Sequence, residues 1–159
     1  MKKINFMLVA VMLLTVFFVG SLTNSNVLYA QDNGVVTVQS KKLFDDTVSD
    51  LRKLISKNGM MVLAEVNHGK ILSMTGLEVN GIALFVGNPQ IGKKLFTANR
   101  GTGLAVPIRV NIYEGTDGKT YVNYVKPSSQ FASFESKEIG MIGKMLDKKL
   151  AMLTGMISK

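Results

Sequence analysis

The segment that most constrains the fold of this chain is residues 106–127, which read VPIRVNIYEGTDGKTYVNYVKP. Apolar and polar residues alternate on both sides of Thr116-Asp117-Gly118, where a type I turn followed by a glycine in the left-handed conformation would close a hairpin. This loop places Ile112 opposite Val122. A shift of one residue would place apolar side chains opposite polar ones, so the alternation selects the first register. The segment therefore predicts an antiparallel β-hairpin.

The two faces of this predicted hairpin differ in character. One face is apolar and is expected to contact the core, and it carries Ile108, Val110, Ile112, Val122 and Tyr124. The opposite face is polar and aromatic, so it is either a ligand site, a dimer interface or a solvated surface. Its members are candidate ligand-binding residues: Arg109, Asn111, Tyr113, Tyr121 and Asn123.

The rest of the chain alternates between strand and helix patterns. Apolar residues from Phe44 to Ile55 recur at the spacing of an amphipathic helix, and Asn58-Gly59 would end it with a left-handed residue. A weak helical turn follows Asn67-His68-Gly69. The remaining elements are predicted as strands over 35–39, 60–66 and 82–86, a helix from 89 to about 99 and a Gly-rich loop after it.

Two further segments are apolar on more than one face, unlike a strand or helix that has one face in solvent. Residues 82–86 (IALFV) are apolar on both faces, which is typical of a strand buried on both sides. The C-terminal segment carries two parallel apolar lines, and a helix with so wide an apolar surface commonly contacts two partners. The lines are Ile142, Leu146, Leu150, Leu153 and Ile157, and beside them Met141, Met145, Met152 and Met156.

These patterns together predict the fold class. We expect a two-layer α/β (α+β) sandwich, with a mostly antiparallel sheet and helices on one face. The core would span about 35–127, and an amphipathic helix would follow over about 137–158. The other face of the sheet would be covered by that C-terminal helix, by a second subunit or by a ligand.

The N-terminus has the pattern of a secretory signal peptide. Two lysines precede the apolar residues 6–20, which are shorter than the roughly 20 residues of a membrane span. Cleavage after Ala30 would leave a single domain, 31–159, in the periplasm or outside the cell. The alternative is an uncleaved N-terminal membrane anchor.

Composition excludes several classes of function. The net charge is +8, but the basic residues are scattered and no nucleic-acid-binding motif is present, so we expect no nucleic-acid partner. The chain has no cysteine and one histidine, which excludes covalent c-type haem and argues against an ordinary metal site. His68 follows a predicted strand, a common place for binding residues. It is either structural, a ligand-binding residue, or the centre of a small enzyme or non-covalent haem site.

The corner Gly87-Asn88-Pro89 also has two interpretations. Asn88 would cap the next helix and Pro89 would be its first residue, where a missing N–H costs nothing. In the functional interpretation, free N–H groups at this helix start bind a carboxylate or phosphate. Gly87 and Asn88 are therefore candidate ligand-binding residues together with His68.

The order of these motifs resembles the family known as domain of unknown function 302. The matching features are a strand into Val66-Asn67-His68-Gly69, the Gly87-Asn88-Pro89 corner and the hairpin with Asp117-Gly118 at its tip, and the resemblance extends from Phe44 to Pro127. Here the corner is one residue longer than the commoner Phe-Gly form, Asn67 replaces the usual Asp, and Tyr113 replaces Trp. The resemblance implies a small αβ sandwich, often dimeric, without an established activity.

We therefore expect an exported, non-catalytic homodimer that binds a small ligand or a partner. The ligand is not identified by the sequence, and neither is a cofactor. A membrane contact is expected only through the N-terminal segment, if it is not cleaved. A small enzyme or haem protein centred on His68 is the alternative.

Overall fold

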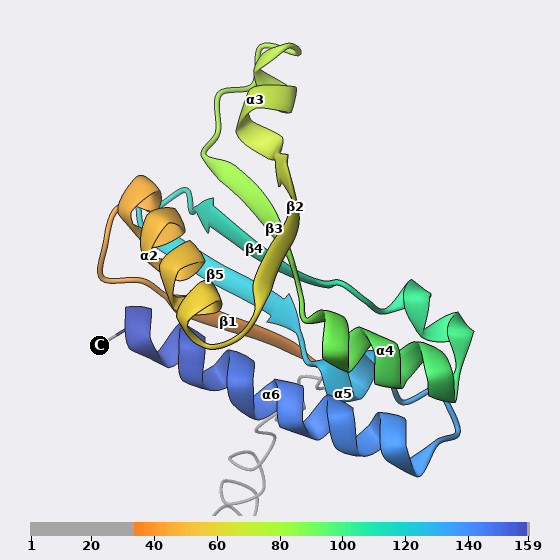
Figure 1. The fold of residues 1–159 in the computed structure, drawn as a ribbon. Coiled ribbons are helices and arrows are strands. Elements are labelled where there is room, and N and C mark those ends of the chain that lie inside the picture. The colour runs from red at the N-terminus through yellow and green to blue at the C-terminus, as the bar shows by residue number, and fades with distance from the viewer. Residues whose placement is uncertain (1–33, 159) are drawn as a thin grey trace, which may run out of the picture. The chain divides into compact units, whose positions relative to one another are not determined.

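The structure, a computed structural model, describes residues 34–158, which form one five-stranded antiparallel sheet with helices (Figure 1). The strand order is β1-β5-β4-β3-β2, so the predicted hairpin lies in the middle of the sheet. The predicted signal segment, residues 1–30, lies outside the described residues. Among the described residues, no helix is long and apolar enough to cross a membrane.

The strands follow the predicted segments closely. They are β1 (Val35–Gln39), β2 (Met61–Asn67), β3 (Gly81–Gly87), β4 (Ile108–Glu114) and β5 (Thr120–Val125). The helices are α2 (Phe44–Lys57), α3 (His68–Ser73), α4 (Pro89–Ala98), the 3₁₀ helix η1 (Arg100–Leu104), α5 (Pro127–Gln130) and α6 (Lys137–Ile157).

The predicted register of the β4–β5 hairpin is confirmed. Ile112 pairs with Val122, and Val110 pairs with Tyr124. Gly118 has a φ of 73°, the left-handed conformation that the turn requires. The apolar face of the hairpin is fully buried, since Ile112 and Val122 are both 0% exposed. Alternation of side chains across the strand therefore decides which hairpin residues enter the core.

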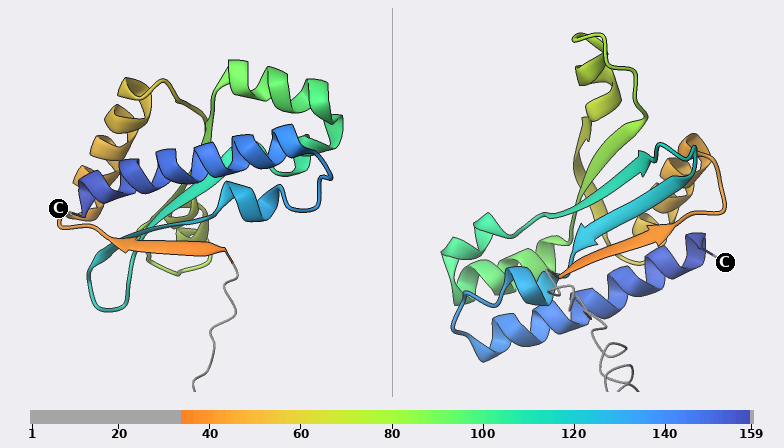
Figure 2. Two further views of the ribbon diagram at one scale, coloured as in Figure 1. Left: turned by 90° about the horizontal axis from the view of Figure 1, so that it is seen from below. Right: turned by 180° about the vertical axis from the view of Figure 1, so that it is seen from behind.

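The helices α2, α4 and α6 form one layer on that apolar face (Figures 1 and 2). Leu51 of α2 and Leu150 of α6 belong to the same core cluster as Leu84 of β3. The suggestion that the C-terminal helix covers the opposite face is therefore wrong. The apolar line of α6 is buried in the core cluster that it shares with α2 and the sheet, where apolar neighbours already exist: Leu146, Leu150, Leu153 and Ile157 are each at most 4% exposed.

The opposite face of the sheet is only partly covered. Ala83 of β3 is 1% exposed and Phe85 is half-buried, so the expected burial of this strand on both sides is reached at Ala83 and not at Phe85. Seen from behind, the strands of the sheet lie in front of α2 (Figure 2). We call this surface the open face.

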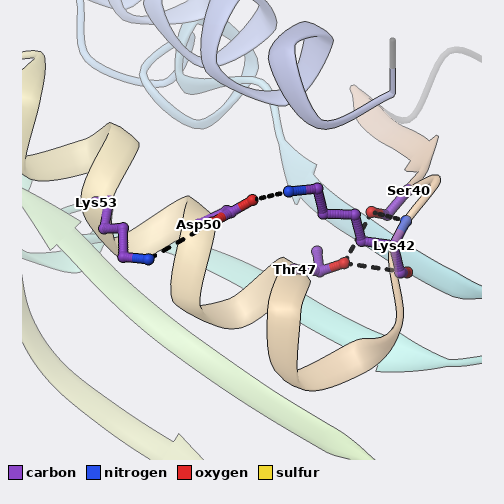
Figure 3. Close-up of polar contacts among 5 residues, drawn as sticks. All are labelled: Ser40, Lys42, Thr47, Asp50 and Lys53. Atoms are coloured by element: carbon purple, nitrogen blue, oxygen red, sulfur yellow. Dashed lines mark hydrogen bonds and ion pairs between the residues drawn. The ribbon is translucent and has the colours of Figure 1, made fainter.

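A small polar network holds the start of α2 to the end of β1 (Figure 3). Thr47 is 0% exposed, and its hydroxyl lies 2.8 Å from that of Ser40. The Lys42 ammonium donates to the Asp50 carboxylate, which lowers the pKa of Asp50 and raises the pKa of Lys42. Leu43, the N-cap residue, makes no side-chain cap, and this network joins the first two turns of α2 to the segment that precedes the helix.

Three local predictions differ from the structure. The Gly-rich segment after α4 is the 3₁₀ helix η1 and not a loop, because Asn99 accepts a hydrogen bond from Gly101 N–H and so starts a new turn. His68 is the first residue of α3, where a loop was expected. The short helix α5 was not expected, since only Pro127 marks its start.

Candidate functional site

The open face contains a hollow of about 470 Å³ beside the middle of the β4–β5 hairpin. It brings together four of the predicted site residues, which come from α3, β4 and β5. The lining residues are Val35, His68, Arg109, Asn111, Asn123, Tyr124, Val125 and Gln130. We call this surface the polar hollow.

Amide groups form the floor of the polar hollow. The Asn111 Nδ2 donates to the Asn123 Oδ1 at 3.1 Å, which joins β4 to β5 through their side chains as well as their backbones. Gln130 donates through its Nε2 to the Val125 carbonyl at 3.0 Å, and it also lines the hollow. The floor is therefore held in place by hydrogen bonds within the protein and still offers polar atoms.

The charge of the hollow is positive. Arg109 is exposed, and it makes no ion pair with another residue of the described range 34–158. No carboxylate is among the residues that line the hollow. A guanidinium offers five N–H donors in a planar fork that matches carboxylate and phosphate oxygens. This arrangement favours an anion over a cation.

His68 reaches the hollow because of the local structure at the end of β2. The Asn67 Oδ1 accepts from Lys70 N–H at 2.8 Å, which starts α3 directly after the strand. Gly81 opposite has no side chain, and a Cβ built there would lie 3.5 Å from the His68 Cβ. His68 itself is half-buried. In the described part of the chain, no three His, Cys, Asp or Glu side chains lie close enough to hold a metal ion.

The two predicted tyrosines lie apart from the polar hollow. Tyr113 and Tyr121 stack with ring centroids 5.5 Å apart, near the tip of the hairpin. The Tyr121 hydroxyl donates to Asp117 at 2.7 Å, which lowers the pKa of Asp117 and raises the pKa of Tyr121. The hydroxyl of Tyr121 is therefore already engaged, and both rings stabilise the hairpin.

The Gly87-Asn88-Pro89 corner acts as the predicted helix cap. The Asn88 Oδ1 accepts from the N–H groups of Gln90 and Ile91, at 2.8 and 3.0 Å. Gly92 N–H donates to the Asn88 carbonyl, and proline has no N–H, so the first turn of α4 keeps no free donor for an anion. Gly87 and Asn88 instead line a second, apolar cavity, away from His68 and Arg109.

Four lining residues of the polar hollow were not identified as site residues from the sequence: Val35, Tyr124, Val125 and Gln130. Tyr124 was assigned to the apolar face of the hairpin. Gln130 depends on α5, a four-residue helix without an amphipathic pattern. Val35 and Val125 reach the hollow because β1 pairs with β5, a contact between segments far apart in the sequence. The only available signal was Pro127 after the hairpin, which marks a helix start but not its position in space.

Comparison with known proteins gives one family and a fold. Residues 36–158 match the family described as Domain of unknown function DUF302. The crystal structure of an uncharacterised conserved DUF302 protein from Bacillus stearothermophilus superimposes with a TM-score of 0.72, at 21% identity, over 78% of this chain and 98% of that one. This likeness confirms the predicted mixed α/β fold.

Curated relatives are also found. The chain is 29% identical over 129 residues to fluoride-specific ion channel FluC 1 of Brucella suis, covering 80% of this chain and 50% of the relative. The FluC 1 protein of Brucella abortus matches at the same identity, with 47% of its length covered. The chain thus spans about half the length of the curated relatives it matches. Because the family match extends over nearly all described residues, this chain belongs to the DUF302 family, as its motifs predicted.

Proposed function

We propose that this chain is an exported, non-catalytic binding protein, which forms a homodimer and binds a small anionic molecule in the polar hollow. The observation that carries the proposal is the exposed Arg109 above a floor of amides, in a hollow without a carboxylate. Export is supported by the N-terminal sequence, with its lysines and its short apolar segment.

The composition of the hollow favours binding over catalysis. His68 is the one imidazole, and no carboxylate lines the hollow to act with it as a second acid or base. Arg109 would contact the anionic group, while Asn123 and Gln130 would contact neutral polar atoms of the ligand. The volume of about 470 Å³ is in the range of small-molecule sites and much larger than a single halide ion needs.

Replacing Arg109 with alanine is expected to weaken anion binding strongly. The Arg109 guanidinium is the charged donor of the hollow, and a charge-assisted hydrogen bond contributes about 1.5–3 kcal/mol, so affinity should fall at least roughly tenfold. Calorimetric titrations with inorganic phosphate, citrate and fluoride would measure this change. Fluoride belongs in the series because the curated relatives bear the name of fluoride channels.

The control is Arg100→Ala, which removes the same charge from the exposed helix η1, outside the polar hollow. Binding that is unchanged in Arg109→Ala, or equally reduced in Arg100→Ala, would contradict a specific site. Binding of fluoride without phosphate or citrate would contradict the expected size of the ligand.

The homodimer is supported by the exposed methionine line of α6. Met141, Met145, Met152 and Met156 are 57%, 42%, 42% and 48% exposed, although they lie on one side of the helix. Their spacing is symmetric about the midpoint between residues 148 and 149. Two antiparallel copies of α6 would therefore pair Met141 with Met156 and Met145 with Met152, as a two-fold interface requires.

This arrangement is compatible with ligand binding, because α6 covers the sheet face opposite the polar hollow. The methionine line spans about 22 Å at 1.5 Å per residue. Methionine is common at adaptable interfaces, since its unbranched side chain fills irregular gaps. The expected result is a dimer whose two polar hollows remain accessible.

Replacing both Met145 and Met152 with glutamate is expected to yield a monomer. The change places charges at the centre of the proposed interface, where losses of 2 kcal/mol or more are typical, so the dimer dissociation constant should rise at least roughly 30-fold. Native mass spectrometry of dilution series would measure it. Met74→Glu is the control, since Met74 is 79% exposed and lies after α3, at a distance from α6 in the sequence and in the fold. A wild-type monomer, or a double variant that stays dimeric, would contradict the interface.

A further inference from the structure

We propose that the apolar cavity behind the Gly87-Asn88-Pro89 corner is a second binding site, for an uncharged apolar molecule the size of one aromatic ring or a short alkyl chain. This site is independent of the polar hollow and of the dimer. It lies between the end of β3, the helix α4 and the segment before β4. Its lining includes Leu63, Gly87, Gly92, Leu95, Phe96 and Pro107.

The chemistry of the cavity wall selects an uncharged ligand. No charged residue lines the cavity. Its one polar side chain, Asn88, accepts from Gln90 and Ile91 N–H and donates through Nδ2 to the Gly59 carbonyl at 2.6 Å. A polar ligand would lose its contacts with water there and find no free partner, which is unfavourable. An apolar ligand has no such cost.

The size of the cavity sets the size of the ligand. Its volume is about 220 Å³. Empty apolar cavities of roughly 150 Å³ in other proteins stay free of water and bind benzene. The cavity is thus large enough for a single substituted ring or a short alkyl chain, and too small for a larger fused ring system.

Two glycines create this space. Gly92 lies within α4 and lines the cavity, and a Cβ built there would meet no atom within 4 Å. Glycine inside a helix is destabilising by roughly 1 kcal/mol relative to alanine. No close neighbour requires a glycine at position 92, so we take the open space beside it as the reason for this residue. At Gly87, a Cβ would lie 2.6 Å from the Leu63 Cδ1. The missing side chain of Gly87 therefore lets Leu63 reach the cavity.

The mouth of the cavity is bordered by exposed apolar side chains. Leu63 is 52% exposed on the edge strand β2, and Phe96 is 46% exposed on α4. Leu63 sits at the point where the register of β2 against β3 shifts. Such an irregularity redirects a side chain out of the strand's normal alternation. Both side chains would contact a ligand that fills the cavity, which would remove their apolar surface from water.

The test uses toluene as the probe and the full chain as the protein. Toluene is expected to bind with a dissociation constant on the order of 1 mM or below, seen as amide shifts in two-dimensional NMR confined to residues around the cavity. It should also raise the unfolding temperature, because a ligand that binds only the folded state stabilises it. Gly92→Leu fills the cavity and should weaken toluene binding at least roughly tenfold.

Gly140→Leu is the matched control. Gly140 is also a helical glycine whose built Cβ meets nothing within 4 Å, but it lies in α6, outside the cavity lining. This variant should bind toluene like the wild type. Gly92→Leu should remain folded, since it gains helix propensity and meets open space, and Gly92→Ala should give an intermediate affinity. Absence of toluene binding in the wild type, or equal binding in Gly92→Leu, would overturn the proposal. Binding of phosphate by Gly92→Leu should be unchanged, which separates this site from the polar hollow.

Discussion

Replacing Gly143 with leucine is expected to destabilise the fold by about 3 kcal/mol or more, a large part of the 5–15 kcal/mol that holds a domain of this size together. Gly143 lies where α6 crosses α5. A Cβ built on it would lie 2.9 Å from the Ser128 Cα and 3.1 Å from the Phe131 Cδ2. Real Cβ atoms do not approach a backbone atom so closely, so α5 and α6 would have to separate.

Two opposing contributions decide whether leucine at Gly143 stabilises or destabilises the fold: helix propensity and the clash with α5. Leucine gains roughly 1 kcal/mol of helix propensity over glycine at either position of α6. At Gly143 the clash with the backbone of α5 exceeds that gain. At Gly140, three residues earlier, a built Cβ meets no atom within 4 Å, so Gly140→Leu should be neutral or stabilising. Substitution by leucine is therefore expected to change stability in opposite directions at Gly140 and Gly143 of α6.

Urea unfolding of the full chain, followed by circular dichroism, would measure both variants. The midpoint should fall for Gly143→Leu and should stay or rise for Gly140→Leu, at similar slopes. Gly143→Ala should lie between the wild type and Gly143→Leu. Equal midpoints for the two leucine variants would show that the packing of α5 on α6 is looser than the structure indicates.

Replacing Phe131 with alanine is expected to lower the free energy of unfolding by about 3–5 kcal/mol. Phe131 is 1% exposed and is one of the largest fully buried side chains among the described residues. It follows α5 directly, so its ring anchors the segment that connects β5 to α6. The loss combines the transfer of a ring's apolar surface with the cavity that remains behind it.

This substitution should also affect the polar hollow. Gln130 precedes Phe131 and donates to the Val125 carbonyl at the floor of the hollow. Once the ring is removed, α5 loses its anchor and Gln130 loses its position, so phosphate binding should weaken even where the variant remains folded. Thermal unfolding and the phosphate titration would measure the two effects.

The control for Phe131→Ala is Phe134→Ala. Phe134 lies one turn further along and is only partly buried at the edge of the core. Phe134→Ala should lower the free energy of unfolding clearly less than Phe131→Ala does, and it should leave phosphate binding unchanged. Equal losses of stability in the two variants would mean that Phe131 has no special role in anchoring α5.

The elements of this fold could be predicted because their signals are local. The alternation in residues 106–127 determined the register of the hairpin, since a shift by one residue would bury polar side chains. Asn88 and Pro89 predicted the start of α4 correctly, because a helix start depends on neighbouring residues alone. The same local hydrogen bonds explain why the corner keeps no donor for an anion.

The sites could be predicted only in part. His68, Arg109, Asn111 and Asn123 do line one hollow. Arg109, Asn111 and Asn123 share the open face of β4 and β5, and His68 begins α3 directly after β2 of the same sheet. Tyr113 and Tyr121 share that face as well, but position along the strand places them near the hairpin tip. A pattern of alternation indicates the face and does not indicate which residues on it will lie around one hollow.

The sequence by itself therefore determined whether most segments are helix or strand, where they begin and end, and which of their faces contacts the core. These properties depend on periodicity over a few residues. The tertiary structure decided which face of the sheet α6 covers, how β1 pairs with β5, and where α5 places Gln130. It also decided that Gly92 borders open space while Gly143 touches a neighbouring backbone. The physical reason is that each of these depends on contacts between segments far apart in the chain. Such contacts are selected by burial of apolar surface over the whole domain, and local propensity carries no information about them.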